Sequence, residues 1–165
     1  MRGTTSALRV IFGYDVGSEY DHEFILVDEE PVHLFDCFSF VNYMMCAAFR
    51  DDESNRGDSS TVMQQNCAHH FAAILERLRP TLLILQGKDI RRWIAKYRAL
   101  AVPEDPPECL IERAQIGDTE CLMLSFSHPS TWADNWGRNH ATRYLTEVVV
   151  PTIRTALSRL GFSGL

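Results

Sequence analysis

The sequence predicts an α/β protein, a three-layer α/β/α sandwich with a mostly parallel central sheet of about four strands. Two observations support this class. Short apolar runs alternate along the chain with segments of helical periodicity, and the runs are apolar throughout, as in strands buried on both faces. The chain has 165 residues, so we expect one domain spanning residues 1–165.

The first half of the chain is expected to supply two strands. Residues 7–13, ALRVIFG, form a short apolar run closed by glycine, which is typical of a buried strand. Residues 14–36 are acidic and aromatic and are predicted to be mostly loop. Residues 37–45, CFSFVNYMM, are predicted to form the second strand, and the polar residues 50–59 a loop.

Helix and strand are then expected to alternate. Ser60 or Thr61 can cap a helix whose apolar residues recur at helical spacing, and Pro80 should end it. The uninterrupted run TLLIL at 81–85 predicts a strand buried on both sides of a sheet. The Gln-Gly pair at 86–87 predicts a turn.

The last third repeats this alternation. Asp89 can cap a second helix, and two apolar runs flank Gly117, which predicts either a hairpin or a last strand preceded by an edge strand. From about Asn139 the pattern is helical again. Pro151 should kink this helix and Gly161 should end it.

This order of elements places polar side chains where strands end. Parallel sheets bind ligands at the carboxyl ends of their strands. The stretches there are 13–17 (GYDVG), Asn42, 86–88 (QGK) and 127–130 (SHPS). An acid, an amide and a histidine, namely Asp15, Asn42 and His128, are therefore predicted to converge at one rim.

Composition limits the partners. The formal net charge of −6 argues against a protein coated in basic surface, without excluding a local basic groove. Five cysteines with no CxxC pair indicate reduced intracellular thiols rather than a disulfide framework. No apolar run has the length of a secretory core or a membrane span. We expect a cytoplasmic protein without a membrane partner, associated with the nucleoid if it acts on DNA.

Four stretches, in this order, resemble the uracil-DNA glycosylase superfamily. VIFGYDVG is similar to its Gly-x-Asp loop after the first strand, and FVNYMMC carries an asparagine with a cysteine four residues on. CAHHFAAILERLRPTLLILQGK is similar to its helix–proline–strand–glycine block, and SFSHPS leads into His-Pro-Ser. The resemblance spans roughly residues 8–160. It is that of a divergent member, because Val16 stands where many members have proline and the linker between the first two strands is short.

The resemblance implies a DNA glycosylase that flips out uracil or another deaminated base and hydrolyses its N-glycosidic bond. Asp15 would activate water or stabilise the positively charged sugar, His128 would donate a hydrogen bond to the departing base, and Asn42 would read its Watson–Crick edge. Aromatic residues can stack on the base, and residues beside the strand ends can wedge into the duplex or hold its phosphates. These further candidates are Tyr14, Tyr20 and Phe24 for the base, and Ser130, Trp132, Trp136, Arg138 and Lys88 for DNA.

No metal or other cofactor is expected. The superfamily's iron–sulfur members have four cysteine ligands, and only the later pair has counterparts here, Cys46 and Cys67. Two thiolates cannot hold a cluster that needs four ligands.

Two alternatives to a DNA glycosylase stay open. One is a catalytically inactive glycosylase-like fold that serves as a nucleic-acid, base or protein binding module. The other is a hydrolase of a small nucleoside or modified base. Each candidate residue also has a purely structural interpretation: Asp15 as a turn residue, His128 as a loop residue fixed by Pro129, and the aromatic residues as core. The sequence does not predict the oligomeric state.

Overall fold

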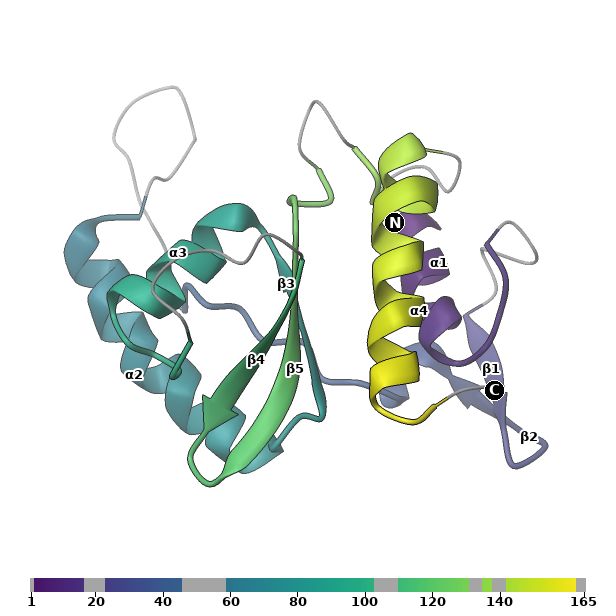
Figure 1. Ribbon diagram of the computed structural model, residues 1–165, viewed down its shortest axis with the longest axis horizontal. Helices are drawn as coiled ribbons and strands as arrows, with labels where there is room; N and C mark the ends of the chain where they lie inside the picture. The colour runs from purple at the N-terminus through teal and green to yellow at the C-terminus, as the bar shows by residue number, and fades with distance from the viewer. Residues whose placement is uncertain are drawn as a thin grey trace. The chain divides into compact units, whose positions relative to one another are not determined.

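The computed structural model describes residues 2–16, 23–45, 59–102, 110–130, 135–137 and 142–162. These residues form both helices and strands, so the predicted mixed α/β class is confirmed (Figure 1). The chain divides into two compact units. The first unit comprises Met1–Phe40, Gln86–Lys88 and Leu124–Leu165, and the second comprises Val41–Leu85 and Asp89–Met123.

The helix and strand at the start of the second unit match the prediction. Helix α2 (Thr61–Leu78) begins after Ser60, whose Oγ accepts the backbone N–H of Met63 at 3.2 Å. It ends at Arg79, which has a positive φ of 46° and lies just before Pro80. Strand β3 (Leu82–Gln86) follows.

Among the described residues the main sheet has three strands, in the order β3-β5-β4, where about four were predicted. Strands β4 (Ile111–Ile116) and β5 (Thr119–Phe126) are joined by two residues, which only an antiparallel pair allows. Strands β3 and β5 are parallel, because Leu122 N–H donates to Thr81 and, further along both strands, Gly87 N–H donates to Phe126. The sheet is therefore mixed.

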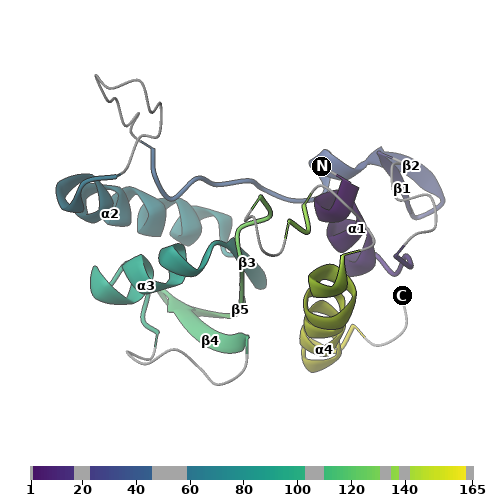
Figure 2. The ribbon, with the colours of Figure 1, turned by 90° about the horizontal axis from the view of Figure 1, so that it is seen from above.

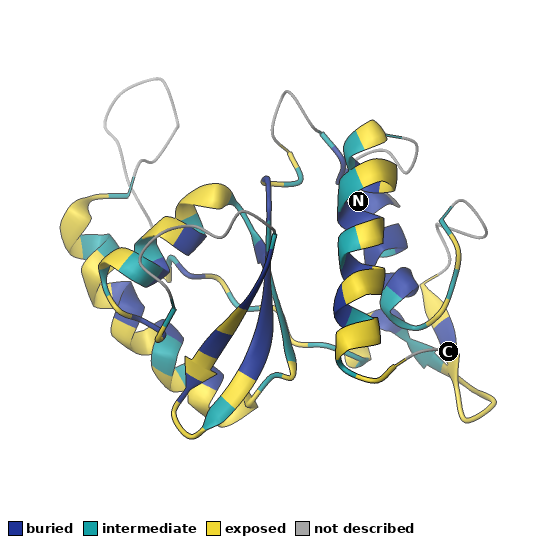
Figure 3. Ribbon diagram, in the orientation of Figure 1, coloured by how far each residue is buried: buried dark blue, intermediate teal, exposed yellow. Residues whose placement is uncertain are grey.

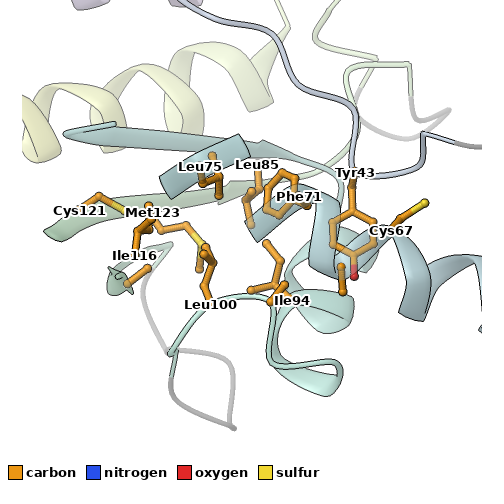
Figure 4. Packing of buried hydrophobic residues seen from close by; sticks show 13 residues of the cluster. Tyr43, Cys67, Phe71, Leu75, Leu85, Ile94, Leu100, Ile116, Cys121 and Met123 are labelled. Carbon is orange, nitrogen blue, oxygen red and sulfur yellow. The ribbon is translucent and has the colours of Figure 1, made fainter. Parts of the chain in front are cut away.

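The core of the second unit lies between its helices and this sheet (Figure 4). Helix α2 contributes Phe71 and Leu75, helix α3 (Lys88–Lys96) contributes Ile94, and β5 contributes Met123. Burial of each such side chain stabilises the fold by roughly 1.5–3 kcal/mol. The predicted helix cap, Asp89, lies inside the first turn of α3 instead.

The first unit begins with a helix, so the predicted strand at residues 7–13 is wrong. Helix α1 (Arg2–Ile11) lies beside helix α4 (Val150–Arg159) in both views (Figure 1 and Figure 2). The apolar run that suggested a strand is only seven residues long, and at that length periodicity cannot separate a strand from a buried helix face.

A hairpin stands where mostly loop was predicted. Strands β1 (Phe24–Val27) and β2 (Glu30–His33) pair in antiparallel fashion, with Phe24 opposite His33 and Val27 opposite Glu30. Asp28 and Glu29 form the turn with φ of 50° and 68°, as tight hairpin turns require. A short 3₁₀ helix, η1 (Leu34–Asp36), follows. The predicted strand at 37–45 is wrong, because these residues form no strand.

The C-terminal helix is confirmed and has an unusual turn where a kink was predicted. A π-helical segment, η2 (Leu145–Val149), runs directly into α4 and precedes Pro151 by two residues. A π-turn changes the hydrogen-bond register and so accommodates a proline that has no N–H to donate. Gly161, with a φ of 81°, stands just past the end of α4. One face of the helix is buried and the opposite face is exposed (Figure 3).

Candidate functional site

Two of the four predicted strand-end stretches meet at one sheet edge. Strands β3 and β5 are parallel neighbours, so their carboxyl ends lie together. A backbone hydrogen bond links the two strand ends, because Gly87 N–H donates to the carbonyl oxygen of Phe126 at 2.9 Å. This bond places Lys88 and His128, each the second residue beyond a strand end, at the same edge. The two strands are parallel neighbours, as expected, and the roles of the residues that follow them stay predictions.

The loop that carries His128 is held by three hydrogen bonds from residues further along the chain. The indole Nε1 of Trp136 donates to the carbonyl of Ser127 at 3.0 Å, and Ser127 N–H donates to the hydroxyl of Tyr144 at 3.0 Å. Gly137 N–H donates to the carbonyl of Pro129 at 2.9 Å. Both backbone groups of Ser127 are therefore fixed, which sets the position of the adjacent histidine.

The fixed loop also depends on a close approach that only glycine allows. A Cβ on Gly137 would lie 2.4 Å from Cβ of Pro129 and 3.1 Å from its carbonyl oxygen. Atoms without a bond between them do not approach to 2.4 Å, so any other residue would push the two segments apart. The sequence signal for this support is the pair Trp136-Gly137; Trp136 was among the predicted DNA contacts, and no role was predicted for Gly137.

The tautomer of His128 is set by its own loop. Its Nδ1 accepts the backbone N–H of Ser130 at 3.2 Å and lies 2.8 Å from the Ser130 hydroxyl. A backbone amide can only donate, so Nδ1 carries no proton and the neutral imidazole bears it on Nε2. The side chain is exposed, and no further contact to its ring is found among the described residues. Nε2–H is therefore a fixed donor that faces solvent.

Asp15 is not brought to this edge by a strand. It follows helix α1, and its exposed carboxylate accepts a hydrogen bond from Arg154 of α4 at 2.7 Å. Arg154 lies ten residues beyond Tyr144, the residue that binds the His128 loop, or about 15 Å along a helix. The contacts of Asp15 and of the His128 loop thus fall on different stretches of the C-terminal helix, and the structure gives no support to their predicted convergence.

Asn42 likewise does not follow a strand. It is exposed in residues 41–45, which have no strand pairing, and it belongs to the second unit, whereas His128 belongs to the first. Its predicted role in reading a base therefore stays a prediction without structural support.

The aromatic candidates separate into structural and exposed residues. The hydroxyl of Tyr14 accepts the N–H of Leu26 at 2.9 Å, and the guanidinium of Arg9 lies 4.1 Å from the centre of its ring. Tyr14 thus ties the hairpin to the residues after α1. Phe24 is more than half exposed and meets the His33 ring edge-on at 5.3 Å.

The predicted DNA contact of Trp136 is wrong. Its side chain is 1% exposed and its Nε1 is engaged within the fold, so it cannot insert between bases while this packing persists. Ser130 is used to hold His128, and Lys88 remains an exposed cation at the sheet edge. The other three candidates, Tyr20, Trp132 and Arg138, lie outside the described residues.

No metal site is found in the described parts of the chain, where no three His, Cys, Asp or Glu side chains are grouped to hold an ion. The thiol of Cys67 accepts the N–H of Met45 at 3.4 Å, and Cys46 is outside the described residues. Of the described helices, none combines the length and the apolarity needed to cross a membrane.

Comparison with family models, with curated proteins and with solved structures finds no match to this chain. The functional argument therefore rests on the residues themselves, and first on the His128 loop.

Proposed function

We propose that the His128 loop binds a nucleobase, with uracil or another deaminated base in DNA as its ligand. The observation that carries this proposal is the tautomer of His128, because Ser130 occupies Nδ1 and leaves the proton on an exposed Nε2. A base carbonyl oxygen is an acceptor that this donor can satisfy. Lys88 at the same sheet edge supplies a cation for a neighbouring phosphate.

Hydrolysis of the N-glycosidic bond is the second candidate function. When that bond breaks, its electron pair stays with the base, and negative charge builds on the base oxygen. A fixed donor such as Nε2–H stabilises this charge, and one such contact contributes roughly 10²- to 10³-fold in rate. Water must also add to the sugar carbon and lose a proton. Asp15 was the residue predicted to assist that step, and its carboxylate binds Arg154 instead. Base binding without hydrolysis therefore rests on fewer assumptions.

The binding proposal is tested with fluorescently labelled single-stranded oligonucleotides. One carries a single uracil, and a matched one carries an abasic analogue at the same position. We expect the uracil strand to bind more tightly and His128→Ala to reduce this preference by about 2- to 12-fold, the value of one hydrogen bond of 0.5–1.5 kcal/mol. Lys88→Ala should weaken the binding of both oligonucleotides equally and reduce the dependence of their affinity on salt concentration.

The matched control is Ser127→Ala, since the buried Ser127 hydroxyl has no hydrogen-bond partner among the described residues, where only its backbone supports the loop. This variant should bind as the parent protein does. Equal affinity of the parent for the uracil and abasic strands would reject base binding. Release of free uracil, measured separately by chromatography, decides between binding alone and hydrolysis, and an active protein should lose about 10²-fold or more in rate on His128→Ala.

A further inference from the structure

Five neighbouring aromatic rings form an exposed patch on the first unit, which we call the aromatic surface. It consists of Phe24, His33, Phe35, Phe38 and Phe40, and adjacent ring centres lie 4.8–5.9 Å apart. Phe24, Phe35 and Phe40 are 56%, 45% and 60% exposed. Single exposed apolar residues need no explanation, whereas a contiguous aromatic patch marks an interaction site.

The hairpin that carries part of this surface is apolar on both faces, and the described residues cover only one of them. Ile25 is buried against Leu8 and Leu34. The register puts Leu26 opposite Pro31 on the same face as Phe24 and His33, and Leu26 is exposed. The surface is also preorganised, because Nδ1 of His33 accepts the N–H of Phe35 at 3.2 Å.

The chain segment that carries the aromatic surface is strongly acidic. Residues 10–49 hold eight of the 22 acidic residues and none of the 16 lysines and arginines, so this segment carries −8 and the rest of the chain carries 16 minus 14, or +2. Among the described residues next to the rings, Glu23 and Asp36 are exposed. Such a surface repels nucleic-acid phosphates and an identical copy of itself, and attracts cationic side chains.

The edges of the hairpin are poorly suited to pairing with an added strand. On the outer edge of β1, the carbonyl of Phe24 accepts Nη1 of Arg9 at 2.7 Å, and Leu26 N–H donates to Tyr14. On the outer edge of β2, Pro31 has no N–H to offer. The side-chain face is therefore the part of the hairpin that a partner can use.

We propose that the aromatic surface binds a basic, partly apolar peptide segment of a partner protein. Lysine or arginine side chains of the partner segment lie over the phenylalanine rings, where cation–π attraction acts. They also form ion pairs with Glu23 and Asp36. Apolar side chains of the segment cover Phe35 and Phe40. The inference is independent of the His128 loop, since it uses none of the same residues.

The test uses three labelled synthetic peptides of equal length, in which leucine alternates with arginine, leucine with glutamate, or glycine with arginine. We expect the arginine–leucine peptide to bind and the other two to bind at least about tenfold more weakly. Phe35→Ala and Phe40→Ala should each lower the affinity for the arginine–leucine peptide by about 2- to 5-fold, which corresponds to the loss of one exposed cation–π contact. Glu23→Lys, which leaves the rings intact, should weaken it as well.

Val62→Ala is the matched control, since Val62 is exposed on α2 and belongs to the second unit. It should bind the peptide as the parent does, and circular dichroism should show every variant to be folded. Equal binding of the arginine–glycine peptide would overturn the proposal, because acidity alone would then account for the affinity. If an oligonucleotide binds the parent protein and Phe40→Ala abolishes that binding, the partner is a nucleic acid and the proposed peptide partner is wrong. A dimer in light scattering that Phe40→Ala abolishes would assign the surface to self-association instead.

Discussion

Replacing Gly137 with alanine tests the support of the His128 loop directly. The added Cβ would meet Pro129 Cβ at 2.4 Å and the Pro129 carbonyl carbon and oxygen at 3.2 and 3.1 Å. Three atoms of one rigid residue are involved, and no flexible side chain can move aside. The segment must shift by about 1 Å, which breaks the bond from Gly137 N–H to Pro129 and strains the adjacent contact between Trp136 and Ser127.

The size of the effect follows from these contacts. Overpacking of a buried site costs about 1–3 kcal/mol, and loss of one hydrogen bond about 1 kcal/mol more. For a chain of this length, 2–4 kcal/mol lowers the melting temperature by roughly 4–16 °C. Urea unfolding should show the midpoint falling with an unchanged slope. Binding of the uracil oligonucleotide should fall together with stability, because the displaced loop carries His128.

Gly161→Ala is the matched control. Gly161 has a φ of 81° and no described atom within 4 Å of its Cβ position, so alanine there strains the backbone by about 1 kcal/mol without a clash in the described part of the chain. It should lower stability modestly and leave oligonucleotide binding unchanged. If Gly137→Ala proves as stable as the parent and binds as well, the loop is not held by this close approach and the reasoning is refuted.

Three further predictions concern the second unit. Arg91→Ala should destabilise this unit by about 3–5 kcal/mol in urea unfolding, because the buried Glu112 loses two hydrogen bonds of 3.0 Å. The Arg91→Met/Glu112→Leu double variant should recover most of this stability. Ser60→Ala should cost about 1 kcal/mol as the loss of a helix cap, whereas exposed Thr61→Ala should cost less. Burial, then the nearby Tyr97 and Cys67, raises the pKa of Tyr43 from 10.0 to about 12. This tyrosine therefore ionises first in the unfolded state, so stability should fall as pH rises from 10 to 12. Tyr43→Phe should reduce that fall, to which Cys121 also contributes, because burial raises its pKa from 9.0 to about 11.

The elements that the sequence predicted well are those with a long pattern. Helix α2 repeats its apolar face over five turns and begins at Ser60, and the hairpin of β4 and β5 brackets Gly117. Helix α1 was misassigned because its apolar run is short enough to suit either element. The hairpin of β1 and β2 was missed because Asp28 and Glu29 form its turn without the glycine or asparagine that normally signals one.

The same limits explain which site residues could be predicted. His128 and Lys88 follow strands that the sequence does encode clearly, so their shared edge could be inferred from strand order alone. Asp15 and Asn42 were assigned to strand ends that the described residues do not form, so their predicted convergence stays a prediction without support from those strands. Trp136 was misjudged because two tryptophans in a loop indicate either a binding rim or a packed lid, and only burial separates the two.

Charge gives the chain two chemically different surfaces. The −8 of residues 10–49 would oppose any phosphate, so a nucleic acid that reaches His128 must be held by cations elsewhere, of which Lys88 is one at the same edge. The same segment carries exposed phenylalanine rings on and after a hairpin whose inner face is buried through Ile25. Exposed rings lower solubility, and the acidic residues of the segment offset this effect by repelling identical copies. A cationic, partly apolar segment gains binding energy from both the acidic charge and the exposed rings. Both features disfavour the binding of a phosphate backbone.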